Sequence, residues 1–380
     1  MSIRIIYGDC RKELISLPDQ CVHCCMTSPP YFGLRDYGTA KWEGGDPECD
    51  HVKVMDHIAA VATSTLGGGK KSTGHIQEGF KTQCGRCGAR RIDSQIGLES
   101  TPDAFVAEMV NVFREVRRVL RDDGTVWLNL GDSYSSGGRT TQVLDTAKGP
   151  TKRDIGTDET NGKQEYLNGT AMRPPVITGL GPKQLIGIPW RVAFALQVDG
   201  WYLRQDIIWS KPNPMPESVT DRCTKAHEYI FLLSKNARYY YDADAIKYES
   251  ARVGEICGTG PKSLSRGQAR GANVSATGNA KDGGFCISPK MSNKRSVWEI
   301  ATQSFSDAHF ATFPPALIEP CVLAGCPKGG TVLDPFAGAG TTGLVADRLQ
   351  RNAVLIELNP DYVKMAQQRI HDDAPLLVTL

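Results

Sequence analysis

The stretch Gly330-Thr-Val-Leu-Asp334-Pro-Phe-Ala-Gly338-Ala-Gly340-Thr-Thr342 joins a short apolar run to a helical segment through a glycine-rich turn. A second apolar run follows at 353–357, which predicts a strand–helix–strand unit. Gly338 and Gly340 allow a tight turn, and the first amides of the helix can bind an anionic group. Glu357 ends the second strand, where it can accept hydrogen bonds from ribose hydroxyls. An ordinary glycine-rich turn is the alternative, because neither the Walker spacing nor the full GxGxxG pattern is present.

Strands alternate with helices in the rest of the chain as well. One helix is predicted to begin at Thr101, a capping residue that precedes Pro102. The runs 205–209 and 228–233 are close enough in sequence to form an antiparallel pair. We therefore predict an α/β fold with a doubly wound, Rossmann-like sheet, mostly parallel with one antiparallel strand, plus insertions. The remaining predicted elements are strands at 3–7, 22–27 and 125–130, a helix at 187–196 and a final helix from residue 360.

Ser28-Pro29-Pro30-Tyr31 is a second unusual turn, directly after the apolar run 22–27. Each proline fixes its φ and lacks an N–H, so nearby carbonyls are free to accept hydrogen bonds. An exocyclic amine offers two N–H donors, and Ser28 Oγ and the Pro29 carbonyl could each accept one. Tyr31 adds a flat ring on which a flipped base can stack. A rigid surface turn is the alternative, but the preceding strand and the aromatic side chain favour the functional interpretation.

The two turns together resemble the motifs of DNA amino-methyltransferases, which methylate cytosine N4 or adenine N6. The run 334–342 is similar to the family's S-adenosylmethionine motif, 357–362 to its ribose-binding motif, and 313–320 to the segment over the methionine end. The resemblance implies that S-adenosylmethionine is the cofactor and that Ser28, Pro29, Pro30 and Tyr31 are catalytic. The cofactor-binding residues that it implies are Asp9, Asp334, Pro335, Phe336, Gly338, Gly340, Thr341, Thr342, Glu357 and Asn359.

The order of the motifs matches the family's permuted β class, because the catalytic motif precedes the cofactor motif by about 300 residues. We still expect the two strands to be neighbours, with both turns at the topological switch point. The segment 129–132 follows a predicted strand and could line the same cleft or form a plain turn. Ser28 favours cytosine by resemblance, since the family associates Ser with N4-cytosine and Asp with N6-adenine. Adenine N6 is the alternative, while a protein or RNA methyltransferase and an inactive zinc-dependent DNA-binding module are more distant ones.

Four residues in a polar segment supply the donor set of a tetrahedral zinc site: Cys49, His51, Cys84 and Cys87. The segment has too little apolar content to fold alone, and metal binding would stabilise it. Unrelated side chains in a loop are the alternative, and His57 and His75 are rival ligands. We predict a structural zinc ion at this knuckle.

A basic, glycine-rich segment near the middle of the chain suits contact with nucleic-acid phosphates. Residues 251–296 contain eight Lys or Arg and two acidic residues, a surplus of six, whereas the whole chain carries a net charge of only +2. A solvated linker is the alternative. The partner expected from the resemblance is double-stranded DNA, and a cognate restriction endonuclease is a candidate partner. The residues predicted to contact DNA are Lys211, Asn213, Arg266, Arg270, Lys294 and Arg295.

Length and composition set the remaining expectations. The chain of 380 residues is too long for one minimal domain, and 40% hydrophobic and 23% charged residues describe an ordinary soluble protein. No apolar run could span a membrane, and no secretory signal precedes the twelve cysteines, so we expect a cytoplasmic protein of bacterial or phage origin with reduced thiols. The predicted parts are a catalytic half at 1–35, 101–134 and 185–250, a zinc-knuckle insertion at 36–100, a flexible insertion at 135–184, a DNA-recognition segment at 251–300 and a cofactor-binding half at 301–380.

Overall fold

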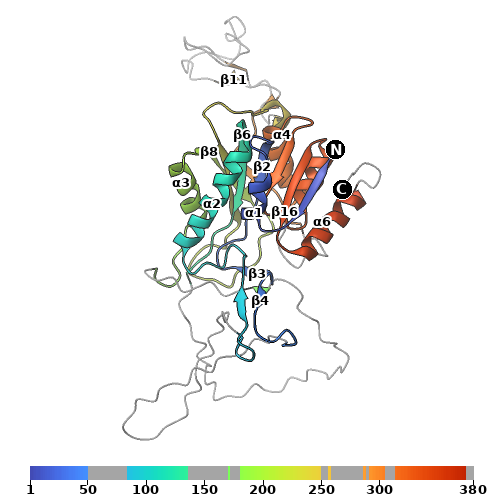
Figure 1. The fold of residues 1–380 in the computed structure, drawn as a ribbon. Coiled ribbons are helices and arrows are strands. Elements are labelled where there is room, and N and C mark those ends of the chain that lie inside the picture. The colour runs from blue at the N-terminus through green and yellow to red at the C-terminus, as the bar shows by residue number, and fades with distance from the viewer. Residues whose placement is uncertain are drawn as a thin grey trace, which may run out of the picture.

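The computed structural model describes residues 1–49, 84–135, 170–171, 180–249, 256–257, 286–287, 291–303 and 313–373. Its centre is an eight-stranded sheet in the order β1-β16-β15-β2-β6-β9-β8-β14 (Figure 1). The strands are β1 (Ile3–Tyr7), β2 (Val22–Thr27), β6 (Leu120–Leu130), β8 (Tyr202–Ser210), β9 (His227–Ser234), β14 (Val297–Glu299), β15 (Thr331–Asp334) and β16 (Asn352–Glu357). Only the pairs that include β9 are antiparallel, which confirms the predicted mostly parallel sheet with one antiparallel strand.

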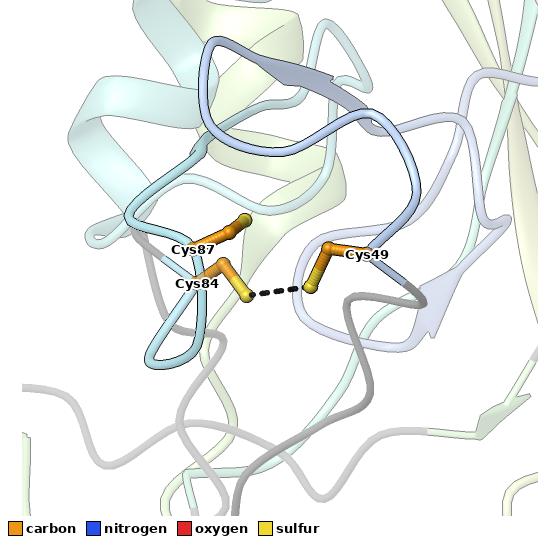
Figure 2. A group of neighbouring side chains, drawn as sticks. All are labelled: Cys49, Cys84 and Cys87. Carbon is orange, nitrogen blue, oxygen red and sulfur yellow. Dashed lines mark hydrogen bonds between the residues drawn. The ribbon is translucent and has the colours of Figure 1, made fainter.

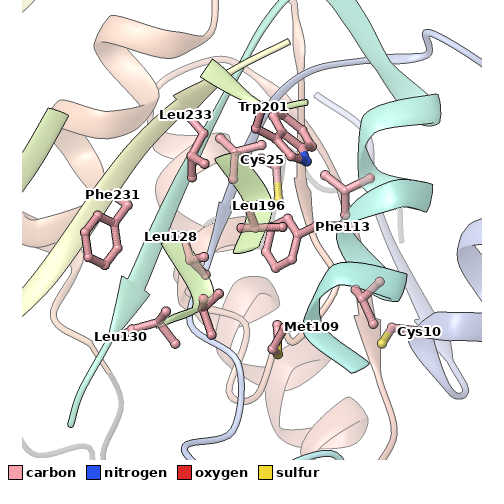
Figure 3. Close-up of a cluster of buried hydrophobic side chains, with 14 of the residues drawn as sticks. Cys10, Cys25, Met109, Phe113, Leu128, Leu130, Leu196, Trp201, Phe231 and Leu233 are labelled. Atoms are coloured by element: carbon pink, nitrogen blue, oxygen red, sulfur yellow. The ribbon is translucent and has the colours of Figure 1, made fainter. Parts of the chain in front are cut away.

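Helices cover both faces of this sheet and enclose two apolar cores. The first face carries α1 (Cys10–Glu13), α2 (Pro102–Val119) and α3 (Ile188–Val198), and the second carries α4 (Pro315–Gly325), α5 (Thr341–Arg348) and α6 (Pro360–Asp373). Successive residues of the central strands point to opposite cores, as strand geometry requires. Figure 3 shows part of the first core, where Met109 and Phe113 of α2 lie beside strand residues such as Leu128.

The sequence of α2 explains both where the helix begins and which side it buries. Thr101 Oγ accepts a hydrogen bond from the Ala104 amide at 3.1 Å, and Pro102 occupies the first turn. The larger apolar side chains recur at helical spacing, and those on the face toward the sheet are buried: Phe105, Met109, Val112, Phe113, Val116 and Val119. At Leu120 the backbone becomes extended, and the chain passes directly into β6.

Short elements connect these layers. The 3-10 helices are η1 (Leu14–Ser16) and η2 (Asp244–Ile246). Four two-stranded ladders pair β3 (Arg35–Asp36) with β7 (Thr170–Ala171), β4 (Lys41–Glu43) with β5 (Arg90–Ile92), β10 (Tyr248–Glu249) with β13 (Met291–Ser292), and β11 (Ile256–Cys257) with β12 (Cys286–Ile287). Among the described helices, none is long and apolar enough to cross a membrane.

Three elements of the main layers were not predicted, and one of them, α1, is a helix of only four residues. Helix α4 is apolar on nearly every side and contains Pro320, so it shows neither the polar face nor the uninterrupted backbone that identifies a helix in a sequence. Strand β14 is only three residues long and joins the sheet edge beside β8, although it lies in the segment assigned to DNA recognition. The assignment of roles to parts of the chain stays a prediction.

The sheet places the two unusual turns side by side. Strand β15 pairs with β2 in parallel, with Val332 opposite Cys24 and Leu333 opposite Cys25. From β2 the chain crosses through α2 to β6, whereas from β15 it crosses through α5 to β16 on the other side. Diverging crossovers leave a crevice at the carboxyl ends of the two strands. The expectation that both turns meet at the topological switch point is therefore confirmed.

Candidate active site

A cavity of about 910 Å³ lies at this switch point, and both turns line it. Its lining combines the end of β2 with the turn after β15, the end of β16 and the loop after β8. The cavity thus joins segments that are about 300 residues apart in the chain. The predicted site residues that line it are Asp9, Ser28, Pro29, Pro30, Tyr31, Lys211, Asn213, Pro335, Phe336, Gly338, Thr341 and Glu357.

Asp334 lies behind the cavity rather than in its wall. Its fully buried carboxyl group accepts hydrogen bonds from Thr27 Oγ and Thr342 Oγ, each at 2.6 Å, and from the Phe336 amide at 3.1 Å. Burial raises the pKa of Asp334 to about 6 against the lowering effect of these three donors. Asp334 therefore joins the end of β2 to the turn after β15 and sets the relative position of the two motifs.

The glycine-rich turn is held against the end of β16. Gly338 has φ of 52° and its amide donates to Glu357 Oε2 at 2.7 Å, while the Asn359 amide donates to Oε1 at 2.8 Å. Gly340 has φ of 74°, and a Cβ there would lie 2.7 Å from the Cβ of Ala366, so only glycine fits. Burial raises the pKa of Glu357 to about 7. A buried carboxyl group facing a cavity is suited to accept hydroxyl donors from a ligand.

The catalytic turn is tied to the end of β6. Ser28 Oγ donates to Asn129 Oδ1 at 3.2 Å, and Asn129 Nδ2 donates to the Tyr229 carbonyl at 3.1 Å. The segment 129–132 was expected either to line the cleft or to form a plain turn, and Asn129 does line the cavity. Asp132 instead accepts hydrogen bonds from the Gly187 and Ile188 amides and caps the start of α3.

Glu228 and Lys211 form an ion pair at the same end of the cavity. Glu228 Oε2 accepts a hydrogen bond from the Tyr31 hydroxyl at 2.7 Å, and its other oxygen pairs with the Lys211 ammonium. The ammonium also lies 4.3 Å from the centre of the Trp209 ring. Burial, followed by the nearby Glu228 charge, keeps the pKa of Tyr31 well above its ordinary value. Tyr31 is consequently a neutral donor with a fixed ring.

Asp9 is engaged by its own helix. It is the N-cap of α1, where its Oδ1 accepts from the Arg11 amide at 3.0 Å, and its Oδ2 pairs with the Arg11 guanidinium at 2.7 Å. Its side chain is only 13% exposed but still borders the cavity.

Several side chains of the cavity wall were not singled out as site residues in the sequence, among them Tyr37, Gln95 and Glu228. Tyr37 and Gln95 belong to the segment that was interpreted as a zinc-knuckle insertion. The signal for Glu228 is weak, because it is one charged residue at the start of an otherwise apolar strand. Strand pairing, which a single sequence does not display, carries it beside Asn129.

The predicted zinc ligands gather in part. The Sγ atoms of Cys49, Cys84 and Cys87 all lie within 4.8 Å of one another, and those of Cys49 and Cys84 are 3.9 Å apart (Figure 2). None of the three lines the cavity. His51, His57 and His75 lie outside the described residues.

The predicted DNA contacts are dispersed. Asn213 exchanges hydrogen bonds with the backbone of Thr302 at the cavity rim. The Lys294 ammonium lies 5.0 Å from the Trp298 ring centre, and the Arg295 guanidinium lies 5.8 Å from that of Tyr248. The two other predicted contacts, Arg266 and Arg270, lie outside the described residues.

Three known proteins to which this chain is similar are methyltransferases, and the family whose model matches it is one of DNA methylases. The N6/N4 methyltransferase family model, described as DNA methylase, matches residues 22–368. The Type II methyltransferase M.SmaI of Serratia marcescens is 40% identical over 97% of this chain and 91% of its own length. M.Cfr9I of Citrobacter freundii is 39% identical over 96% and 87%, respectively. The solved structure of the cytosine-N4-specific PvuII DNA methyltransferase shares the fold at 15% identity, with a TM-score of 0.51 and coverage of 98% of this chain and 92% of that one.

Proposed function

The chain belongs to the N6/N4 DNA methylase family, and from that premise we propose that it methylates the exocyclic N4 amine of a flipped-out cytosine in double-stranded DNA. The methyl donor in this proposal is S-adenosylmethionine. The observation that carries it is the meeting of the Ser28–Tyr31 turn with the glycine-rich turn and Glu357 in one cavity. A donor site and an amine site must adjoin for direct transfer.

The residues present fit the cofactor. Glu357 offers a carboxyl group to ribose hydroxyls, and the turn at Gly338 and Gly340 leads into the N-terminus of α5. When bound, S-adenosylmethionine supplies a methyl group on a positively charged sulfur, which is already activated for transfer. The protein therefore has to hold the acceptor amine in line with that group and keep water out.

Ser28 is suited to hold the amine because its own proton is engaged elsewhere. A serine hydroxyl can donate or accept, and here it donates to Asn129 Oδ1, which leaves its lone pairs for an incoming N–H. The Pro29 carbonyl can accept the second N–H. Drawing both hydrogens away from the ring plane frees the nitrogen lone pair, which forms the new bond to the methyl carbon as the bond to sulfur breaks. One amine proton then leaves to solvent.

Cytosine is proposed over adenine because Ser28 stands where the family associates serine with cytosine N4. The test is to incubate the protein with isotope-labelled S-adenosylmethionine and a genomic DNA library that contains every short site. Nucleoside mass spectrometry should then detect labelled N4-methyldeoxycytidine. Labelled N6-methyldeoxyadenosine as the product would overturn the choice of base, and unlabelled DNA from protein that binds the cofactor would overturn the function.

Ser28→Ala provides the matched control for that experiment. It should bind the cofactor as the wild type does but transfer methyl groups at least about 100-fold more slowly, the loss typical of one polarising group. Equal turnover by both proteins would remove Ser28 from the mechanism.

The DNA partner is expected to lie across the cavity mouth and the basic segment. We propose that Asn213, Lys294 and Arg295 face the DNA, together with Arg266 and Arg270 of the basic segment. Lys211 was predicted as a DNA contact, and its pairing with Glu228 supports a role in positioning the base pocket instead. A cognate endonuclease and a cytoplasmic location belong to the same proposal, and the names of the bacterial relatives as Type II methyltransferases are consistent with both.

A structural zinc ion also remains part of the proposal. The thiol groups of Cys49, Cys84 and Cys87 lie close enough together to share one ion. Their position outside the cavity supports a structural role, because a catalytic ion would have to reach the reacting atoms. His51 is the proposed fourth ligand.

A further inference from the structure

Two arms of the chain connect the cysteine cluster to the cavity. The first runs from Tyr37 through β4 to Cys49, and the second runs from Cys84 through β5 to Gln95. They pair antiparallel, with Lys41 opposite Ile92 and Glu43 opposite Arg90. Because of this pairing, the cysteines gather at one end of the arms and the cavity-lining residues at the other.

The cysteine end has the dimensions of a zinc–thiolate site. Zinc–sulfur bonds of about 2.3 Å in a tetrahedron place two sulfur atoms about 3.8 Å apart, and Cys49 Sγ lies 3.9 Å from Cys84 Sγ. This distance is too long for a disulfide bond between Cys49 and Cys84. Figure 2 shows the sulfur atoms of Cys49 and Cys84 facing each other across the gap between the two arms, with the side chain of Cys87 close to that of Cys84.

The turn around the cysteines is built for close approach. The Gly88 amide donates to the Cys84 carbonyl at 2.9 Å, and the Cys84 amide donates to the Ala89 carbonyl at 2.7 Å. On the opposite arm, Gly45 has φ of 73°, and a Cβ there would lie 2.8 Å from Cys87 Sγ. A side chain at position 45 would push the arms apart at the place where the sulfur atoms meet.

The arms have almost no apolar core of their own. In the described stretches 37–49 and 84–95, the buried apolar residues are Cys84 and Ala89. Burial of so little apolar surface does not compensate for the entropy of ordering two arms of this length. Metal binding would supply the missing free energy, as it does in other domains with small cores.

The far end of the arms forms a wall of the cavity. The Tyr37 amide donates to Gln95 Oε1 at 2.7 Å, and Gln95 Nε2 donates to the Arg35 carbonyl at 2.7 Å. The wall is joined to the cofactor half of the core, since Asn359 Nδ2 donates to the Tyr37 carbonyl at 3.3 Å. The Tyr37 ring meets the Tyr362 ring edge-on at 6.3 Å.

We infer that a zinc ion bound by Cys49, Cys84 and Cys87 clamps the two arms together and so positions Tyr37 and Gln95 as a wall of the cofactor end of the cavity. The inference rests on the proposed function for the identity of the cofactor, but the metal site itself does not. Loss of the metal should loosen the wall while the two cores under the main sheet stay folded, because the arms contribute little to those cores.

The metal site is tested by the zinc content of the purified full chain, measured by mass spectrometry. We expect about one zinc per chain in the wild type, and its loss in Cys49→Ser and Cys84→Ser. Cys223→Ser is the matched control, because Cys223 is exposed and belongs to no cluster among the described residues, and it should keep its zinc. Wild-type protein that is purified in zinc-containing buffer and contains no zinc would overturn the site.

The clamp is tested by the affinity for S-adenosylhomocysteine, measured by calorimetry. Removal of zinc from the wild type with a chelator should weaken binding by at least about tenfold, because the wall must then be ordered on binding, and zinc should restore it. Unchanged affinity would overturn the clamp. Because this experiment uses the wild-type protein, it tests the clamp even if a cysteine variant fails to fold. Neither test of the clamp measures methyl transfer. A protein that keeps zinc and binds the cofactor, but modifies no DNA in the mass-spectrometry experiment above, would therefore refute the proposed function without contradicting the clamp.

Discussion

Acidification should weaken binding of the nucleoside part of the cofactor through one carboxyl group, that of Glu357. Burial raises its pKa to about 7, although the amides of Asn359 and Gly338 donate to it and act in the opposite direction. Ribose hydroxyls donate more strongly to an ionised carboxylate than to a protonated carboxyl group, which has less acceptor capacity. Ligand binding therefore favours the release of a proton bound to Glu357 in the free protein.

The size of the effect follows from that pKa. A carboxyl group with a pKa of about 7 is about 91% ionised at pH 8 and about 9% at pH 6, so the dissociation constant should rise up to about tenfold over that range, or about 1.4 kcal/mol. The direction of the effect follows from the raised pKa of Glu357. As the pH falls through this pKa, the carboxyl group of the free protein becomes protonated, and the affinity for the ligand falls.

The assay is calorimetric titration with methylthioadenosine, which carries the ribose but no titratable amino-acid portion. Buffers with different ionisation enthalpies also count the protons released on binding. Glu357→Gln should bind more weakly at every pH but show a flat profile between about pH 6 and about pH 8. A wild-type affinity that is equal at both ends of the range, with no proton release, would refute this role of Glu357.

Three further predictions concern the frame of the site. A Cβ at Gly131 would overlap the Tyr31 ring and displace it. Gly131→Ala should therefore lower turnover at least about tenfold, with cofactor affinity and melting temperature nearly unchanged. Normal turnover of this variant would show that the position of the Tyr31 ring is unimportant. For Asp334, whose pKa is raised to about 6 in the folded state, the unfolding free energy of the wild type should fall by up to about 3 kcal/mol as the pH rises from about 4 to about 7. That contribution should be missing in urea titrations of Asp334→Asn, and an identical pH dependence would contradict it. Phe113→Ala, in the fully buried core, should cost about 3–5 kcal/mol in urea unfolding, whereas Phe194→Ala, at a site 52% exposed, should cost far less; equal costs would contradict the packing.

Local pattern alone determined the main elements of the core and the type of both motifs. Short apolar runs predicted β1, β2, β15 and β16 within a residue or so. The inner strands β2, β15 and β16 are easily seen in the sequence because buried parallel strands are apolar on both faces. The order of the two motifs, with strand–helix alternation, was enough to predict that they meet at one edge of the sheet. The cysteine spacing likewise predicted which thiols gather.

The tertiary structure alone decided which other side chains complete the site. Glu228 reaches Tyr31 because β9 runs antiparallel beside β6, and this pairing is a long-range choice of partner that no local pattern encodes. Tyr37 and Gln95 were assigned to an insertion, since their segment is polar and aperiodic, yet the two arms carry them into the cavity wall. The sequence shows which side chains a strand or turn can bring to a site. Which of these side chains come close together depends on the order and register of the strands, and these are set by burial of apolar surface over the whole chain.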